Sequence, residues 1–426
     1  MNITMLRHKL LLLCASFFVM QVRAAPGAVI SIDSCYARSA IHYPLSKQYR
    51  MLTQSGNWQL DQAAKGYLPQ LLLAGQATHQ SAVTQLPVDI PNLHIPTLDK
   101  TQYRVYGEVS QSLTGFHTVG TQRDLIRDNT EMELQKNRVE LYKVKDRVNN
   151  LYFGVLLTDA QLAQNALYKQ DILAGLDKAN TAFEAGTILK SDVDQLKVEL
   201  LKADQKNTEL RANRVAYLGM LSELTGLVLD TDTRLIVPAA PATTATEITR
   251  PELKLYELQH AYLRRQEQSV NDKLLPNLSL FLQSGLGRPG LNMLDNQTKA
   301  YYIGGVRLNW TFSNYYTAGK EKKLLRLNRD MTEVQKETFL MNTRISRQQY
   351  NAEIMKLEQM LAGDEQIIAL REDILVQFKA QLTYGTTTVT DYITQANAAD
   401  QARQLYQLHN LQLTLAKYNY KNISGE

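Results

Sequence analysis

The sequence predicts a mixed α/β membrane protein, built from a long coiled-coil α-helical barrel and a transmembrane β-barrel. Three observations predict this class. The 426 residues contain an internal tandem duplication. Each half has two segments in which apolar and polar residues alternate, as in half-buried strands. Apolar residues also recur every seven positions, over helices much longer than a globular domain is wide. No run of about 18 apolar residues follows position 24, which excludes a bundle of membrane-spanning helices.

Composition argues against disorder and against metal or thiol chemistry. The chain is 44% hydrophobic and 21% charged, which is enough to build a sizeable core. Its two cysteines, Cys14 and Cys35, are isolated, so neither a CxxC motif nor a disulfide scaffold is present. The sequence has no HExxH or GxSxG motif, and its seven histidines are dispersed. We therefore expect no cofactor, no metal site and no enzymatic activity.

Residues 1–24 are predicted to be a secretory signal peptide. Arg7 and Lys9 precede an apolar stretch over residues 10–20, and Val22 and Ala24 are small enough for cleavage before Ala25. Cleavage would remove three basic residues and lower the formal net charge from +5 to +2. The remaining charge gives no argument for binding nucleic acid.

The mature chain consists of two similar halves, residues 25–230 and 251–424. Several features of the first half recur 199 residues later: Gly120 and Gly319, Gly186-Thr187 and Gly385-Thr386, Asp192 and Asp391. A Leu-Pro pair at 68–69 is repeated at 275–276. Between the halves, residues 231–250 are expected to form a linker because 237–244 are mostly Pro, Ala and Thr.

Within each half we expect a short helix, a strand, a loop, a strand and two long helices. In the first half the heptad positions are Leu134, Leu141, Val148, Val155 and Leu162, and the next helix continues the pattern from Val193 to Leu224. In the second half they are Met331, Val334, Thr338, Met341 and Ile345, followed more loosely by residues 392–420. Helices of about 40 to 60 residues span roughly 60 to 90 Å. Such helices must pack side by side along their length.

Four strands are expected, at about 68–81, 103–114, 275–285 and 301–313. Each is about 10 residues long, the length that crosses an outer membrane when the strand is tilted. Aromatic side chains lie toward their ends, as an interfacial belt at the membrane surfaces requires: Tyr103, Tyr106, Tyr301, Tyr302 and Trp310. Alternation alone also fits a half-buried sheet in a water-soluble protein.

Four strands are too few to close a barrel. An open edge in lipid would leave backbone amides without partners, at a cost of several kcal/mol each. Other copies of the chain must therefore pair with the edges, and three copies give twelve strands, which is within the range of membrane-spanning barrels.

One motif suggests a nucleotide site, but its context does not support one. Residues 285–290 read Gly-Leu-Gly-Arg-Pro-Gly and match GxGxxG. No helix is predicted to begin at the third glycine, so no helix N-terminus is available for a pyrophosphate. An extracellular hairpin loop is the expected structure.

Several segments of the chain resemble the TolC-like outer-membrane efflux proteins, and the resemblance covers nearly the whole mature chain. Residues 31–37, Ser-Ile-Asp-Ser-Cys-Tyr-Ala, resemble the opening helix of that family, and both Leu-Pro pairs match its strand starts. The most specific match is Gly-Thr-Thr-Thr-Val-Thr-Asp-Tyr at 385–392, which resembles the family's helix–turn–helix tip. Residues 186–192 are its counterpart in the first half.

The resemblance implies a homotrimeric channel in the cell outer membrane, with its helical body in the periplasm. Such a channel is the exit duct of a tripartite efflux pump or a type I secretion system. Its tips dock a periplasmic adaptor protein and an inner-membrane transporter; here Gly186, Thr187, Gly385 and Thr386 match the docking tips. Asp192 and Asp391 would then form a periplasmic aperture, where rings of like charge attract cations.

The tip residues also have a purely structural interpretation. Glycine permits a positive φ at a tight reversal, threonine can cap the returning helix, and aspartate is favoured near a helix N-terminus. A second function class also remains open: a periplasmic coiled-coil structural or adaptor protein without a membrane-inserted barrel. The sequence does not identify a transported substrate.

The signal peptide gives the first testable prediction. The mature protein should begin at Ala25 and fractionate with outer membranes, because the basic flank and apolar core direct export and cleavage. N-terminal sequencing of the outer-membrane fraction checks this. An intact Met1, or recovery of the protein in the cytosol, would contradict it.

Overall fold

The computed structural model describes residues 29–84, 97–242 and 247–426. The predicted signal peptide and part of the linker lie outside these ranges. The chain divides into two compact units, which are described separately. The strand unit comprises Pro44–Tyr142, Thr246–Arg347 and Ile423–Glu426, and the tip unit comprises Met1–Tyr43, Lys143–Ala245 and Gln348–Asn422.

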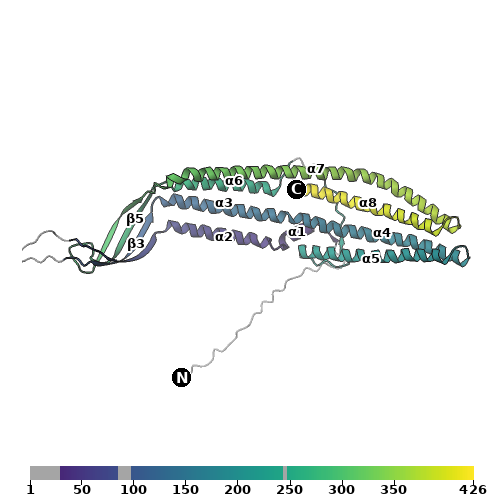
Figure 1. Cartoon of the computed structure of the whole chain (residues 1–426), viewed down its shortest axis with the longest axis horizontal. Helices are drawn as coiled ribbons and strands as arrows, with labels where there is room; N and C mark the ends of the chain where they lie inside the picture. The colour runs from purple at the N-terminus through teal and green to yellow at the C-terminus, as the bar shows by residue number, and fades with distance from the viewer. Residues whose placement is uncertain (1–28, 85–96, 243–246) are drawn as a thin grey trace, which may run out of the picture. The chain divides into compact units, whose positions relative to one another are not determined.

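The second half of the chain has the expected order of elements, and the first half differs from it by an additional helix before its first strand and by a break in its first long helix (Figure 1). The first half contains α1 (Ile32–His42), α2 (Ser46–Ala64), a short 3-10 turn (Lys65–Tyr67), β2 (Gln70–His79), β3 (Thr101–Ser112), α3 (Gly115–Tyr142), α4 (Val144–Glu184) and α5 (Lys190–Thr225). The second half contains α6 (Pro251–Asp272), β5 (Asn277–Arg288), β6 (Lys299–Asn309), α7 (Asn314–Thr383) and α8 (Val389–Ser424). The first long helix is interrupted at Lys143, whereas α7 continues for 70 residues.

The strand unit contains a four-stranded antiparallel sheet in the order β2-β3-β5-β6. β2 and β6 are its edge strands, and within the described residues each pairs on one side only. Gly285 allows a close approach in the middle of the sheet, since a Cβ there would lie 2.2 Å from the carbonyl oxygen of Val105. Gly285 and Gly287 of the GxGxxG motif therefore belong to β5. The expected hairpin loop begins only after Arg288.

The two faces of this sheet differ in polarity. One face carries ten large apolar side chains that are each 46–81% exposed: Leu71, Leu73, Tyr103, Val105, Leu280, Leu282, Leu286, Tyr302, Val306 and Leu308. On the other face the Arg307 guanidinium donates two hydrogen bonds to the Glu108 carboxylate, at 2.7 and 3.1 Å. The Arg307 guanidinium also lies 4.4 Å from the centre of the Phe281 ring. We call the first the apolar face and the second the polar face.

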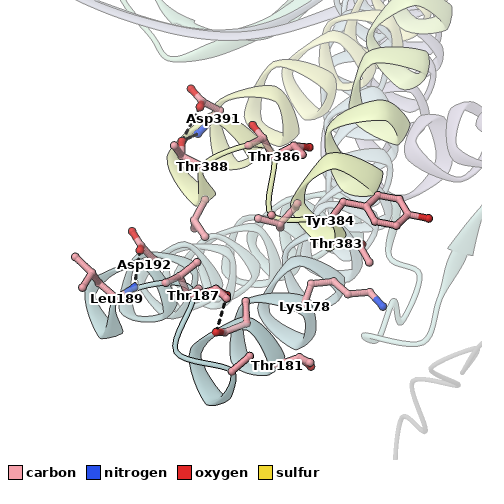
Figure 2. A pocket seen from close by; sticks show the side chains of 17 residues that line it. Lys178, Thr181, Thr187, Leu189, Asp192, Thr383, Tyr384, Thr386, Thr388 and Asp391 are labelled. Carbon is pink, nitrogen blue, oxygen red and sulfur yellow. Dashed lines mark hydrogen bonds between the residues drawn. The ribbon is translucent and has the colours of Figure 1, made fainter.

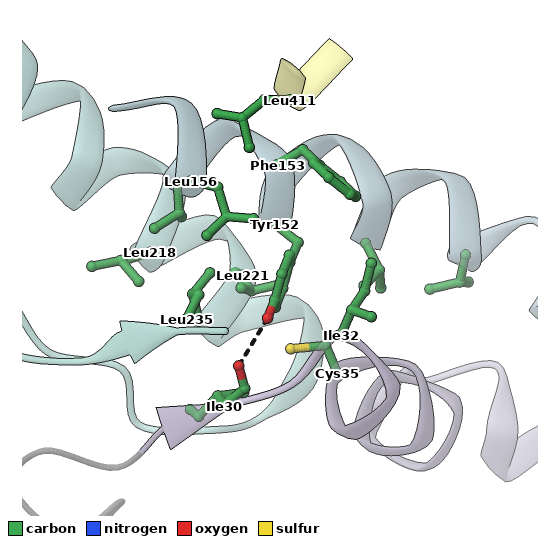
Figure 3. Packing of buried hydrophobic residues seen from close by; sticks show 13 residues of the cluster. Ile30, Ile32, Cys35, Tyr152, Phe153, Leu156, Leu218, Leu221, Leu235 and Leu411 are labelled. Atoms are coloured by element: carbon green, nitrogen blue, oxygen red, sulfur yellow. Dashed lines mark hydrogen bonds between the residues drawn. The ribbon is translucent and has the colours of Figure 1, made fainter. Parts of the chain in front are cut away.

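In the tip unit, a hydrophobic cluster forms around Tyr152 of α4 (Figure 3). The Tyr152 hydroxyl lies 2.8 Å from the carbonyl oxygen of Ile30 and 2.7 Å from that of Ile236, and it is fully buried. Burial raises the pKa of Tyr152. It also raises the pKa of the neighbouring Cys35 thiol to about 12.

The two segments that supply these carbonyl oxygens also pair with each other as short parallel strands, which the sequence does not predict. β1 (Val29–Ile30) pairs with β4 (Arg234–Leu235). β4 lies within the stretch expected to be a linker, so residues 231–236 are part of the folded tip unit. Arg214 of α5 contributes to this arrangement because its guanidinium donates to the carbonyl oxygens of Thr231 and Thr233, each at 2.7 Å.

A second cluster holds α4, α5, α7 and α8 together, and small residues allow the helices to approach closely. Ala203, Ala396 and Ala399 are almost completely buried in it. Tyr392 is fully buried, and its hydroxyl donates to the carbonyl oxygen of Asp171 at 2.6 Å. A Cβ at Gly175 would lie only 2.3 Å from the Tyr392 ring. The heptad pattern of the sequence predicts these seams correctly.

The seam expected on the first part of α7 is not buried within the chain. Met331, Val334, Met341 and Ile345 are 48–60% exposed. The apolar spacing is correct, but no other described element covers these four side chains. No helix in the described parts of the chain is long and apolar enough to span a membrane.

The contact between Gly175 and Tyr392 gives a stability prediction. Gly175→Ala should lower the free energy of unfolding by about 1–3 kcal/mol, because the buried, hydrogen-bonded ring has no room to move. Gly219→Ala in α5 is the matched control, since no heavy atom apart from its chain neighbours and its own helix backbone lies within 4 Å of the added Cβ. It should stabilise the helix by about 0.5–1 kcal/mol. Thermal unfolding of the detergent-solubilised variants measures both, and equal effects would contradict the packing argument.

Candidate functional site

The two helix reversals at the end of the tip unit have the same backbone geometry, one in each half of the chain. Gly186 and Gly385 have φ values of +71° and +68°. The amide of Gly186 donates to the carbonyl oxygen of Phe183, and that of Thr187 to Ala182. The amides of Gly385 and Thr386 repeat both bonds, to Leu382 and Gln381. This is the pattern of a Schellman motif, which requires a left-handed residue at the glycine position.

The threonines that follow these glycines close the outgoing helix. The Thr187 hydroxyl donates to the carbonyl oxygen of Ala182 at 2.8 Å, and the Thr386 hydroxyl to that of Gln381 at 3.2 Å. The expectation that they cap the returning helix is therefore wrong. The carbonyl oxygens at the end of a helix lack a donor within the helix. Those of Ala182 and Gln381 each accept from both the amide and the hydroxyl of the threonine.

The returning helices begin differently in the two halves. At α8, the Thr388 hydroxyl accepts from the Asp391 amide at 3.1 Å and donates to the Asp391 carboxylate at 2.6 Å. At α5 the equivalent residue is Leu189, which has no capping side chain. There the Asp192 carboxylate accepts from the Leu189 amide at 3.0 Å. Both aspartates therefore serve the helix starts, as the structural interpretation of the sequence expects.

A hollow lies between the two turns (Figure 2). Its lining includes Lys178, Thr187, Leu189 and Asp192 from the first half and Tyr384, Thr386 and Asp391 from the second. Five of the six tip residues that the sequence singles out line this hollow, and the sixth, Gly186, directly precedes Thr187 in the first turn. The structure adds Leu189 and Tyr384, whose side chains are 71% and 82% exposed. Neither was selected from the sequence, because an exposed apolar residue is recognised only once burial is known.

Behind the tips, polar side chains connect the helices of the tip unit. Arg403 of α8 donates to Asp171 of α4 and to Glu372 of α7, both at 3.1 Å. The Tyr168 hydroxyl lies 2.7 Å from Asn397 and 3.0 Å from Glu199. In the sequence, Asn397 and Arg403 each follow a buried alanine of the helix interface. Sequence alone does not show which polar residues at such positions are buried. Such polar contacts between α4, α7 and α8 favour one alignment of these helices along their length.

The five aromatic residues of the expected belt do not share one face of the sheet. Tyr103 and Tyr302 lie on the apolar face and are 54% and 75% exposed. Tyr106 and Tyr301 lie on the polar face, and Tyr301 is only 8% exposed, so the assignment of these two to a lipid-facing belt needs correction. Trp310 follows β6 and is 45% exposed. The pleat decides this, since successive residues of a strand point to opposite faces.

Among the described residues, no three His, Cys, Asp or Glu side chains are grouped closely enough to hold a metal ion. No protein-family model and no curated protein matches the sequence. Solved structures, however, match its fold. The alignment with the Campylobacter jejuni CmeC outer membrane channel covers 92% of this chain and 85% of the CmeC chain, with a TM-score of 0.65 and 12% sequence identity.

Two further structures match over similar lengths. CusC, described as undergoing conformational changes on transmembrane channel formation, covers 92% of both chains, with a TM-score of 0.67 and 14% identity. The open state of the Neisseria gonorrhoeae MtrE outer membrane channel covers 92% of this chain and 89% of its own, with a TM-score of 0.66 and 12% identity. This chain has the fold of these outer-membrane channels. The TolC-like fold expected from the tip motifs and the Leu-Pro strand starts is confirmed.

Proposed function

We propose that the protein is a homotrimeric outer-membrane channel and the exit duct of a tripartite efflux pump or a type I secretion system. The observation that carries this proposal is the apolar face of the sheet. Ten large side chains, 46–81% exposed, form one continuous surface across all four strands. Soluble proteins rarely expose apolar patches of more than a few hundred Å². Lipid is the environment that such a face fits.

The edges of the sheet support a trimer. In lipid, the unpaired amide and carbonyl groups of β2 and β6 would each cost several kcal/mol. Pairing β6 of one copy with β2 of the next removes both edges, and three copies give a closed barrel of twelve strands. The polar face, with its Arg307–Glu108 pair, then lines an aqueous lumen. Tyr103, Tyr302 and Trp310 remain as the interfacial aromatic residues.

The exposed seam on α7 supports the same assembly. Met331, Val334, Met341 and Ile345 have heptad spacing but no cover from the described residues of their own chain. Neighbouring copies supply that cover if the helices form a ring. The helical body lies in the periplasm in this arrangement, and the tips meet a periplasmic adaptor and an inner-membrane transporter. Gly186, Thr187, Gly385 and Thr386 form the docking turns.

The alternative, a periplasmic coiled-coil structural or adaptor protein, fits the helices but not the sheet. A soluble sheet of this kind would cover its apolar face with helices or a second sheet. Within the described residues, nothing covers that face. The alternative is therefore the weaker proposal.

Assembly gives a direct test of the proposed function. Protein extracted from outer membranes in detergent should be a trimer by native mass spectrometry, and it should form stable conducting pores in planar bilayers. Val306→Glu on the apolar face should reduce the yield of inserted trimer, since a charged side chain that faces lipid destabilises a membrane-spanning strand. Ile303→Glu, on the polar face of the same strand, is the matched control and should insert. A soluble monomer with an intact sheet would refute the proposal.

The aspartates at the tips give a second prediction, about ion selectivity. If Asp192 and Asp391 line the periplasmic aperture, Asp192→Asn with Asp391→Asn should reduce cation selectivity, and the difference should shrink as salt rises. Asparagine keeps an oxygen that can accept from the Leu189 amide and the Thr388 hydroxyl, so the turns should stay folded. Reversal potentials in planar bilayers measure the effect. Unchanged selectivity at low salt would mean that these residues only support the helix starts.

A further inference from the structure

The two tip turns share a backbone but differ in the side chains that they present. Residues 188–190 are Ile-Leu-Lys in the first turn, and the equivalent residues 387–389 are Thr-Thr-Val in the second. The hydrogen bonds that close the outgoing helices are the same in both. The difference is therefore not needed to form the turn.

Leu189 is in an unfavourable position for the folding of its own helix. It is the N-cap of α5, with φ −87° and ψ 157°, where leucine is among the poorest residues and threonine among the better ones. Its side chain is also 71% exposed. The second turn demonstrates the better choice, since Thr388 at the same position caps α8. Leu189 is thus both a poor N-cap and an exposed apolar side chain, and it gains no packing within its own chain. A residue of this kind indicates a contact with another molecule.

The surroundings of Leu189 favour a protein partner over a membrane. Leu189 is followed by Lys190 and Asp192, and it lines the hollow of the tip together with Tyr384 and several threonines. Binding to a bilayer needs a large apolar area on one face. Leu189 and Tyr384 are two exposed side chains among charges and hydroxyls, and so small an apolar area instead suits a protein partner with a small apolar recess, as buried anchors in protein interfaces do.

We propose that Leu189 is the apolar anchor by which the first tip binds the periplasmic adaptor, and that the two tips are unequal docking points. The second tip has threonine at positions 387 and 388, and the Thr388 hydroxyl is already bonded to Asp391, so this tip contributes less to affinity. This inference rests on the proposed function because it takes the partner to be the adaptor. It adds that an adaptor ring with identical subunits meets two chemically different tips in each protomer.

The test uses a substitution that should improve folding while it weakens binding. Leu189→Thr copies the capping residue of the second turn, so its melting temperature should equal or exceed that of the wild type. Thr388→Ala is the matched control: it removes a cap and should destabilise α8 slightly, yet leave binding nearly unchanged. Leu189→Met keeps an apolar side chain of similar volume and should also bind.

The probe is the adaptor crosslinked to the wild-type channel in cells, identified by mass spectrometry and then purified. Titrated onto the detergent-solubilised channel, it should bind Leu189→Thr about ten- to a hundredfold more weakly than the wild type, the loss expected for one buried leucine. Thr388→Ala and Leu189→Met should stay within about threefold.

Three results would overturn the inference, and they are distinguishable. Equal binding by Leu189→Thr would remove Leu189 as the anchor while leaving adaptor docking intact. Failure of the purified adaptor to bind the wild type would refute docking itself, and this inference with it. A dimer of trimers in native mass spectra that Leu189→Thr abolishes would assign the leucine to a contact between copies of this chain.

Discussion

The exposed apolar face of the four-stranded sheet is the constraint on which the rest of the molecule depends. Its side chains have no cover within the described residues, and the strands β2 and β6 have one unpaired edge each. Hydrophobic burial and backbone hydrogen bonding are both left incomplete in one chain. Lipid and neighbouring copies can complete them together, which is why a single proposal accounts for the face, the edges and the exposed seam of α7.

The duplication places two residues of opposite charge at equivalent positions of the two halves. Glu108 and Arg307 are 199 residues apart, at equivalent positions of the two halves, and they pair across β5 on the polar face. The same backbone position thus carries opposite charges in the two halves. The pair forms because the two halves differ at this position, since equal charges there would repel.

The two tip turns likewise share their backbone conformation and differ in their side chains. The left-handed glycines and the threonine hydroxyls that close the outgoing helices are shared, because the reversal of two antiparallel helices demands them. The N-cap positions diverged, since Asp192 alone can support the α5 start by accepting from the Leu189 amide. That support leaves position 189 without a capping role.

The sequence by itself determined the duplication, the order of helices and strands, the alternation of the sheet and the six tip residues. These depend on local periodicity and on residues such as glycine, whose backbone range is intrinsic. Tertiary structure decided which groups each residue meets. It assigned Thr187 and Thr386 to the outgoing helices, put Tyr106 and Tyr301 on the polar face, and paired residues 234–235 with residues 29–30. It also showed that Tyr392 is buried against Gly175 whereas Leu189 is exposed, because burial depends on contacts between residues far apart in the chain, which local patterns do not specify.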